Sequence, residues 1–236
     1  MRHFLLAATA LGAVALATPA GAVLQISADI NGTSFTCADQ AACDTNAAVG
    51  QLAIADQTIA GVQFLGSAQT QVIGPTNSLN TSSFQVINNN ATTATIQLAV
   101  SGINFLGPVS AFTASGSGTF QSAIGSNVSL TFFGDASNTQ GANNPTDLPG
   151  LPLATITHAA VLATDAFADN ANGPFVAPGL YSMSLGTTGT LTAGGSLVGR
   201  SQAIVTEQVV PEPGTLGLLG VGLLGLGYVA RRRQAT

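Results

Sequence analysis

The chain has 236 residues, with ten acidic side chains against five basic ones, and contains neither lysine nor tryptophan. Between residues 23 and 209 nine carboxylates face a single arginine, Arg200, which gives a net charge near −8. A nucleic-acid binder needs clustered Lys and Arg to displace counterions from phosphate, so this composition excludes that class. The many Asn, Thr, Ser and Gln residues suit a solvated extracellular surface instead.

The first 22 residues are typical of a secretory signal peptide. Arg2 supplies a basic start, an apolar run extends from Phe4 to Ala17, and Ala20-Gly21-Ala22 forms a small-x-small cleavage site. We therefore predict export by Sec-type machinery and cleavage between Ala22 and Val23. A retained N-terminal membrane helix is the alternative, which the shortness of the apolar run disfavours.

Cys37 and Cys43 are the only cysteines in the chain. In an exported protein two close cysteines usually form a disulfide, and closing so small a loop stabilises the fold by about 2 kcal/mol in the chain-entropy model. A metal site would need more ligands, and His158 is the only histidine of the exported part. The sequence therefore predicts a Cys37–Cys43 disulfide.

Residues 23–205 alternate between apolar and polar side chains with a period of two, which predicts a β-rich exported domain. The clearest strands are 24–30, 95–100, 128–132 and 181–185. Shorter strands are expected at 51–55, 62–65, 69–73, 83–87, 110–113, 119–124, 153–162, 189–193 and 196–206. We predict a mainly β fold, an antiparallel β-sandwich of jelly-roll type. A β-solenoid is the alternative, disfavoured because no repeat of fixed period is present.

Two long polar segments interrupt this alternation and are predicted to be loops. The first is 134–152 and the second is 164–179. Both are rich in Asp, Asn, Gly and Pro, which favour turns over strands. Loops of this length often carry function, so their carboxylates are candidate site residues.

Catalytic patterns are weak in the exported domain. His158 is a lone histidine in a predicted strand, and neither Gly-x-Ser-x-Gly nor His-Glu-x-x-His occurs. Two carboxylate pairs, Asp165 with Asp169 and Asp135 with Asp147, are the candidates for a hydrolase. Solvated loop acids are the simpler interpretation of both pairs, and no tryptophan is present to stack on a sugar.

Loop oxygens from Asp and Asn also suit calcium. Asp39, Asp44 and Asn46 cluster around the predicted disulfide. Asp169-Asn170-Ala171-Asn172-Gly173 superficially resembles an EF-hand loop, but the first and last ligands would fall on Ala168 and Gly179, so the match fails. We predict no cofactor, with a structural calcium as the alternative.

The C-terminal region contains a short membrane-insertion signal. Residues 206–213 form a stalk in which Pro211 and Pro213 bracket Glu212 and favour an extended backbone. Residues 214–230 are uncharged and rich in Gly and Leu, and as a transmembrane helix they span about 25 Å, the short end of what a bilayer needs. The basic tail, 231–236, should remain cytoplasmic and place residues 23–210 outside the membrane; its stop-transfer residues are Arg231, Arg232 and Arg233.

Together, Val210-Pro211-Glu212-Pro213, the short Gly/Leu span and the terminal arginines resemble the PEP-CTERM sorting signal, over about residues 209–236. The resemblance implies that an exosortase recognises and cleaves this tail during export to the surface of a Gram-negative bacterium. The inner membrane would then hold only the precursor. A permanent C-terminal anchor is the alternative.

The predicted function is that of a non-enzymatic surface or extracellular-matrix protein. The resemblance implies an exopolysaccharide or biofilm context, with extracellular polysaccharide as a candidate partner. A carbohydrate- or calcium-dependent adhesin is the alternative, and a surface hydrolase is the least favoured hypothesis.

Overall fold

The computed structural model describes residues 23–73 and 75–207, which form an all-β domain. Its strands are β1 (Leu24–Ile30), β2 (Thr33–Ala38), β3 (Gln51–Ile59), β4 (Val62–Ile73), β5 (Thr76–Asn88), β6 (Ala94–Phe105), β7 (Val109–Gln121), β8 (Asn127–Asp135), β9 (Leu151–Ala159), β10 (Thr164–Ala177), β11 (Tyr181–Leu191) and β12 (Ser196–Glu207). Within these residues no helix is long and apolar enough to cross a membrane. The predicted signal peptide, the span 214–230 and the basic tail lie outside the described residues.

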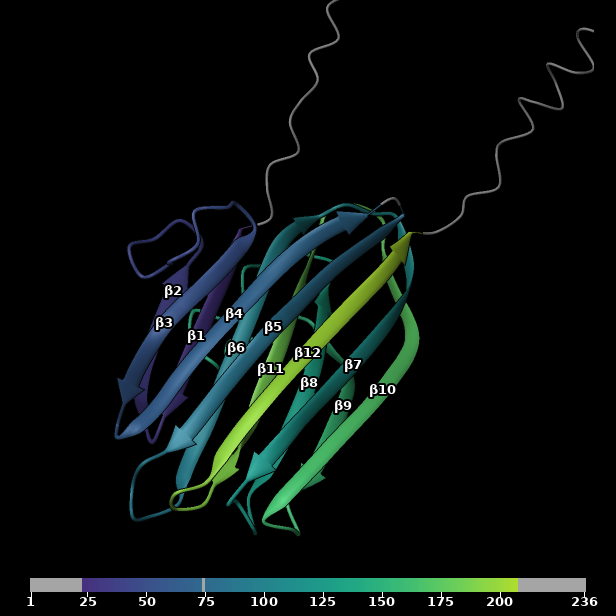
Figure 1. Cartoon of the computed structure of the whole chain (residues 1–236). Coiled ribbons are helices and arrows are strands. Elements are labelled where there is room, and N and C mark those ends of the chain that lie inside the picture. The colour runs from purple at the N-terminus through teal and green to yellow at the C-terminus, as the bar shows by residue number, and fades with distance from the viewer. Residues whose placement is uncertain (1–22, 74, 208–236) are drawn as a thin grey trace, which may run out of the picture.

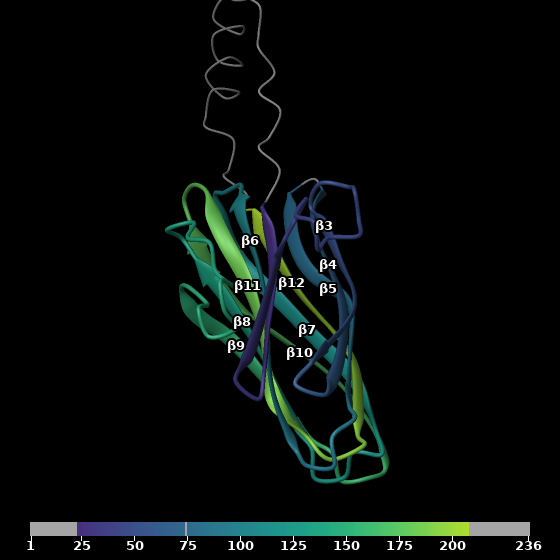
Figure 2. The same ribbon diagram turned by 90° about the vertical axis from the view of Figure 1, so that its left-hand side faces the viewer.

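Two six-stranded sheets face each other as a sandwich (Figures 1 and 2). Sheet A has the order β2-β1-β6-β11-β8-β9, and sheet B has the order β10-β7-β12-β5-β4-β3. From β5 to β12 the chain crosses repeatedly between the sheets, as jelly-roll sandwiches do. All pairings between these strands are antiparallel, which confirms the predicted sandwich and shows that the solenoid alternative is wrong.

The core lies between the sheets, because alternate residues of each strand point inward. In β12, Leu197, Ala203 and Val205 are buried, while Arg200 between them is exposed. The largest fully buried side chains include Phe64, Phe105, Phe120, Phe132 and Tyr181. Burying each of these rings stabilises the domain by roughly 1.5–3 kcal/mol, so the aromatic residues contribute strongly to holding the two sheets together.

Tyr181 joins the two sheets by a polar contact within this core. Its ring stacks on Phe105 and meets Phe175 edge-on, and its hydroxyl accepts a hydrogen bond from the Asn77 side-chain amide at 2.9 Å. Burial raises the pKa of Tyr181 well above its usual value, so the hydroxyl stays protonated. The bond links β11 of sheet A to β5 of sheet B.

The predicted loop at 164–179 is wrong, since most of it forms strand β10. This strand lies at the edge of sheet B and pairs only with β7, so much of its surface faces water and its sequence is polar. Phe167 and Phe175 nevertheless share one face with Asp165, and Phe175 is buried. The alternation is hard to recognise in the sequence because this edge strand is rich in polar residues.

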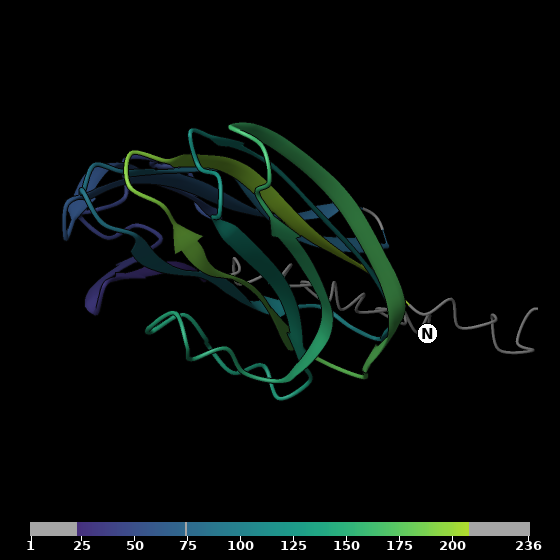
Figure 3. The same ribbon diagram turned by 90° about the horizontal axis from the view of Figure 1, so that it is seen from below.

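The other predicted loop is present, because no strand lies between Asp135 and Leu151. It folds back over the outer face of sheet A, where the Gln25 side-chain amide donates to the carbonyl of Ala142 at 3.0 Å and the Gly141 N–H donates to Ser101 Oγ at 3.1 Å. Figure 3 shows this segment beneath sheet A. Sheet A is thus covered on both faces over this area.

Candidate functional site

A hollow of about 540 Å³ crosses the outer face of sheet B. It is lined by parts of five neighbouring strands, β10, β7, β12, β5 and β4. One row of polar side chains runs across it at right angles to the strands, each residue being the register partner of the next: Asn170, Ser115, Gln202, Asn80 and Gln69. We call this hollow the sheet B groove.

Two oppositely charged residues lie at the sheet B groove. Arg200 lies on β12, where its Nε donates to Ser117 Oγ at 3.2 Å, and Asp169 comes from the edge strand β10. Asp169 shares the inward face of β10 with Asp165 and Phe167, whereas Arg200 faces outward and forms no ion pair among the described residues. Arg200 is therefore the charged group that the groove offers to a ligand.

The floor of the groove is fixed by a buried contact between Thr81 and Ser201. The register of β5 shifts here against both of its neighbours. Against β4 the shift falls between Ser67 and Ala68, and against β12 it falls between Gly199 and Ser201. At the irregularity the Ser201 N–H donates to Thr81 Oγ1 at 2.7 Å, and the two hydroxyl oxygens lie 3.0 Å apart. A side chain thus replaces the ladder partner that the bulge removes, which holds the two central strands in place.

A second hollow of about 340 Å³ continues the groove along the strands, over β10, β7, β12 and β5. It shares Ser82, Ser117 and Arg200 with the first hollow and adds the exposed apolar side chain of Val198. The combined surface therefore offers amides, hydroxyls and one cation beside a small apolar area.

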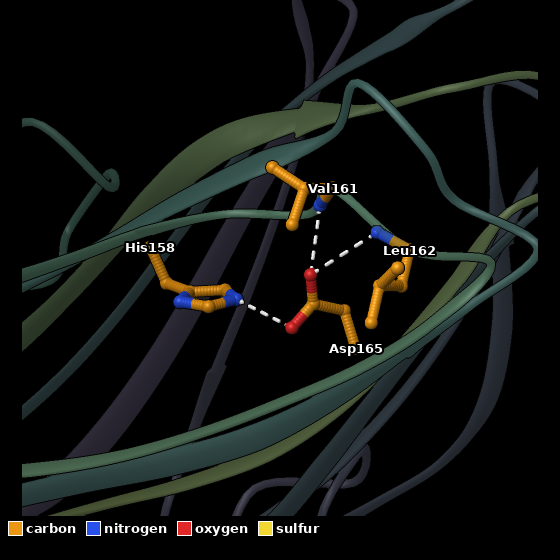
Figure 4. Close-up of polar contacts among 4 residues, drawn as sticks. All are labelled: His158, Val161, Leu162 and Asp165. Atoms are coloured by element: carbon orange, nitrogen blue, oxygen red, sulfur yellow. Dashed lines mark hydrogen bonds and ion pairs between the residues drawn. The ribbon is translucent and has the colours of Figure 1, made fainter.

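His158 and Asp165 meet where β9 of sheet A passes into β10 of sheet B (Figure 4). His158 Nε2 lies 3.1 Å from Asp165 Oδ1, and Asp165 Oδ2 accepts hydrogen bonds from the N–H groups of Val161 and Leu162 at 2.7 and 3.3 Å. The Val161 N–H, the His158 ring and the Leu162 N–H together lower the pKa of Asp165 below its usual value. The prediction of a solvated loop acid is wrong for Asp165.

The ring of His158 is packed as an aromatic side chain. It stacks on Phe167 with 4.9 Å between ring centroids and on Phe120 with 6.1 Å between them. Both oxygens of its carboxylate partner are already bonded, and the pair closes the turn that joins the two sheets. This geometry is that of a structural clamp.

The two predicted carboxylate pairs are not paired sites. Asp165 and Asp169 lie four positions apart on one extended strand, about 13 Å, whereas glycosidase carboxyls lie roughly 5–9.5 Å apart. Asp135 accepts from the N–H groups of Ser137 and Thr139, and these bonds outweigh partial burial and lower its pKa. Asp147 accepts instead from the side-chain amide of Asn143.

The predicted disulfide between Cys37 and Cys43 is confirmed. Of the acids beside it, Asp44 accepts from the N–H groups of Asn46, Ala53 and Gln40, at 2.8 to 3.1 Å. These bonds outweigh partial burial and lower the pKa of Asp44. Within residues 23–73 and 75–207, no group of three or more His, Cys, Asp or Glu side chains could hold a metal ion.

Comparison with solved structures finds only distant similarity. A carbohydrate-binding module in complex with β-1,4-galactotriose is 9% identical, over 63% of this chain and 90% of that one, with a TM-score of 0.31. A mannan-recognising module is 8% identical, over 67% and 90%, with a TM-score of 0.32. A structure of infectious bursal disease virus is 14% identical, over 76% of this chain and 41% of that one, with a TM-score of 0.27. At these values no binding property passes to this chain.

The tail is identified more specifically. Residues 209–234 match the PEP-CTERM protein-sorting motif, which includes Val210-Pro211-Glu212-Pro213 and the three arginines. The chain therefore carries the sorting signal of an exosortase-processed surface protein, while no family profile identifies the exported domain. A search of curated proteins found no match.

Sequence reasoning missed the sheet B groove. The outward positions of each strand could be read from the alternation, but the row joins residues from β10, β7, β12, β5 and β4, and only register aligns them. The one available signal was Arg200, the single arginine of the exported part.

Proposed function

We propose that this protein is an exported, exosortase-processed component of the surface or extracellular matrix of a Gram-negative bacterium, without enzymatic activity. The observation that carries the proposal is the sorting motif at residues 209–234. The inner membrane would hold the precursor by residues 214–230 until cleavage frees the β-sandwich. A net charge near −8 on the exported part supports a solvated location among extracellular polymers.

The non-enzymatic part of the proposal is supported by the arrangement around His158. A histidine that acts as a general base needs a free ring nitrogen within reach of a substrate proton. A carboxylate that assists it needs to orient the ring toward the substrate. Here the ring is packed against Phe120 and Phe167, and Asp165 bonds the backbone of the β9–β10 turn. A hydrolase remains the least favoured hypothesis.

Replacing Pro211-Glu212-Pro213 by Ala-Ala-Ala tests the sorting step. The expected result is a membrane-held precursor of unprocessed mass, because the extended, proline-bracketed site that the protease reads is gone. Cell fractionation followed by immunoblotting would measure the shift. The matched control is Gln208→Ala, just outside the motif, which should be processed like the wild type. Normal processing of the triple variant would contradict the proposal.

A second candidate function, a carbohydrate-binding adhesin, is favoured by one observation, the sheet B groove. The groove is an open polar hollow on a solvent-facing sheet, whereas the corresponding face of sheet A is covered by the loop before β9. Matrix attachment through this groove is compatible with sorting by the tail, since the two features occupy different parts of the chain.

A further inference from the structure

We propose that the sheet B groove binds a segment of an uncharged polysaccharide, laid across the strands along its row of amide and hydroxyl side chains. This inference rests on the second candidate function and names its ligand class. The row, Asn170–Ser115–Gln202–Asn80–Gln69, crosses five strands. At about 4.8 Å between neighbouring strands it is roughly 19 Å long, enough for a short oligosaccharide.

The chemistry of the row matches a polyhydroxyl chain. Each of its four amides presents both donors and an acceptor, and the Ser115 hydroxyl can likewise donate and accept. Neighbouring sugar hydroxyls need this mixture, because each is donor and acceptor at once. Val198, an exposed residue of β12, adds an apolar surface at one side, against which the C–H face of a sugar ring can pack.

The charges favour a neutral polymer. The groove presents one charged side chain, Arg200, which takes part in no ion pair among the described residues. A guanidinium can donate to sugar oxygens. The exported part as a whole carries a net charge near −8, which repels polyanions.

The groove is also prepared for binding before a ligand arrives. The Thr81–Ser201 contact fixes the two central strands below it, and the Arg200 Nε–Ser117 bond orients the guanidinium. Holding side chains on paired strands reduces the ordering that binding must otherwise supply. A neutral polymer can therefore be bound through hydrogen bonds on a surface without tryptophan.

The test uses the processed protein recovered from cells, run by affinity electrophoresis in gels containing a neutral glucan, galactan, mannan or xylan, or a polyuronate. We expect retardation by at least one neutral polymer. The double variant Asn80→Ala/Gln202→Ala and the single variant Arg200→Ala should each weaken it about tenfold or more, since hydrogen bonds to the ligand are lost at the middle of the row.

The matched control is Gln85→Ala, an amide on β5 outside both hollows. It should bind like the wild type, and melting curves would show that all variants are folded. Three results would overturn the inference: no retardation by any neutral polymer, retardation by the polyuronate alone, or unchanged binding by the groove variants. None of these affects the processing of the Ala-Ala-Ala sorting variant, so failure of the groove and failure of the sorting proposal are distinguishable.

Discussion

Asp165 shows how one side chain can look catalytic in sequence and be structural in the fold. Its carboxylate bonds the turn between the sheets through Val161 and Leu162 and bonds β9 through His158. Because the strand that carries it is an edge strand, this clamp anchors the end of β10 that follows the turn from β9 of sheet A. The carboxylate therefore contributes to the stability of the fold.

Asp165→Asn should therefore lower the melting temperature near pH 7. The pKa of Asp165 is lowered in the folded protein, so its stabilising contribution is present above the unfolded pKa of about 3.9 and is lost as pH falls through the lower folded value. The difference in melting temperature between wild type and variant should shrink below about pH 4 for the same reason.

The control for this measurement is Asp56→Asn. Asp56 is an exposed acid of β3 that accepts a hydrogen bond from the side-chain amide of Gln63 rather than from the backbone of a turn. Its variant should melt close to the wild type at every pH. Equal melting of wild type and Asp165→Asn at pH 7 would contradict the clamp.

At the scale of elements, β5 and β12 form the framework under the groove. Their bulges meet, and Thr81 supplies the acceptor that Ser201 N–H would otherwise lack. Thr81 and Ser201 are both buried, although they lie on strands whose outward neighbours are polar and solvated. The position of the groove thus depends on a contact on the inner side of the sheet.

Thr81→Val keeps the shape of the side chain and removes the hydroxyl. The buried Ser201 N–H then loses its acceptor, which should lower the free energy of unfolding by about 1–3 kcal/mol. Urea denaturation would measure the loss. Thr113→Val, on the solvent face of β7, is the matched control and should change stability by less than about 0.5 kcal/mol. Equal stability of both variants would contradict the role of this contact.

These elements also show how much of the fold could be predicted from the sequence. Strands with one buried face, such as β1 and β8, were predicted because their apolar residues alternate. β10 was not predicted, because most of the surface of this edge strand is exposed to solvent and its residues are correspondingly polar. The disulfide was predictable from two close cysteines, whereas the groove was not, since lateral register between distant strands sets it.

At the scale of the whole molecule, the described chain enters at Val23 and leaves after Glu207 at the same end of the sandwich (Figure 1). The sheet B groove lies along the side, across the middle of the strands. Strand β12 includes Thr206 and Glu207, so the sheet extends two residues into the segment predicted as a stalk. In the proposed precursor the membrane-proximal end and the polymer-binding face are therefore separate surfaces.

The intact mass of the wild-type protein from the surface fraction of exosortase-producing cells tests the sorting account most directly. We predict a chain that begins at Val23, lacks residues 214–236 and is two hydrogens lighter than its reduced form, because Cys37 and Cys43 are bonded. A surface protein that retains residues 214–236 would contradict the account and make the tail a permanent anchor.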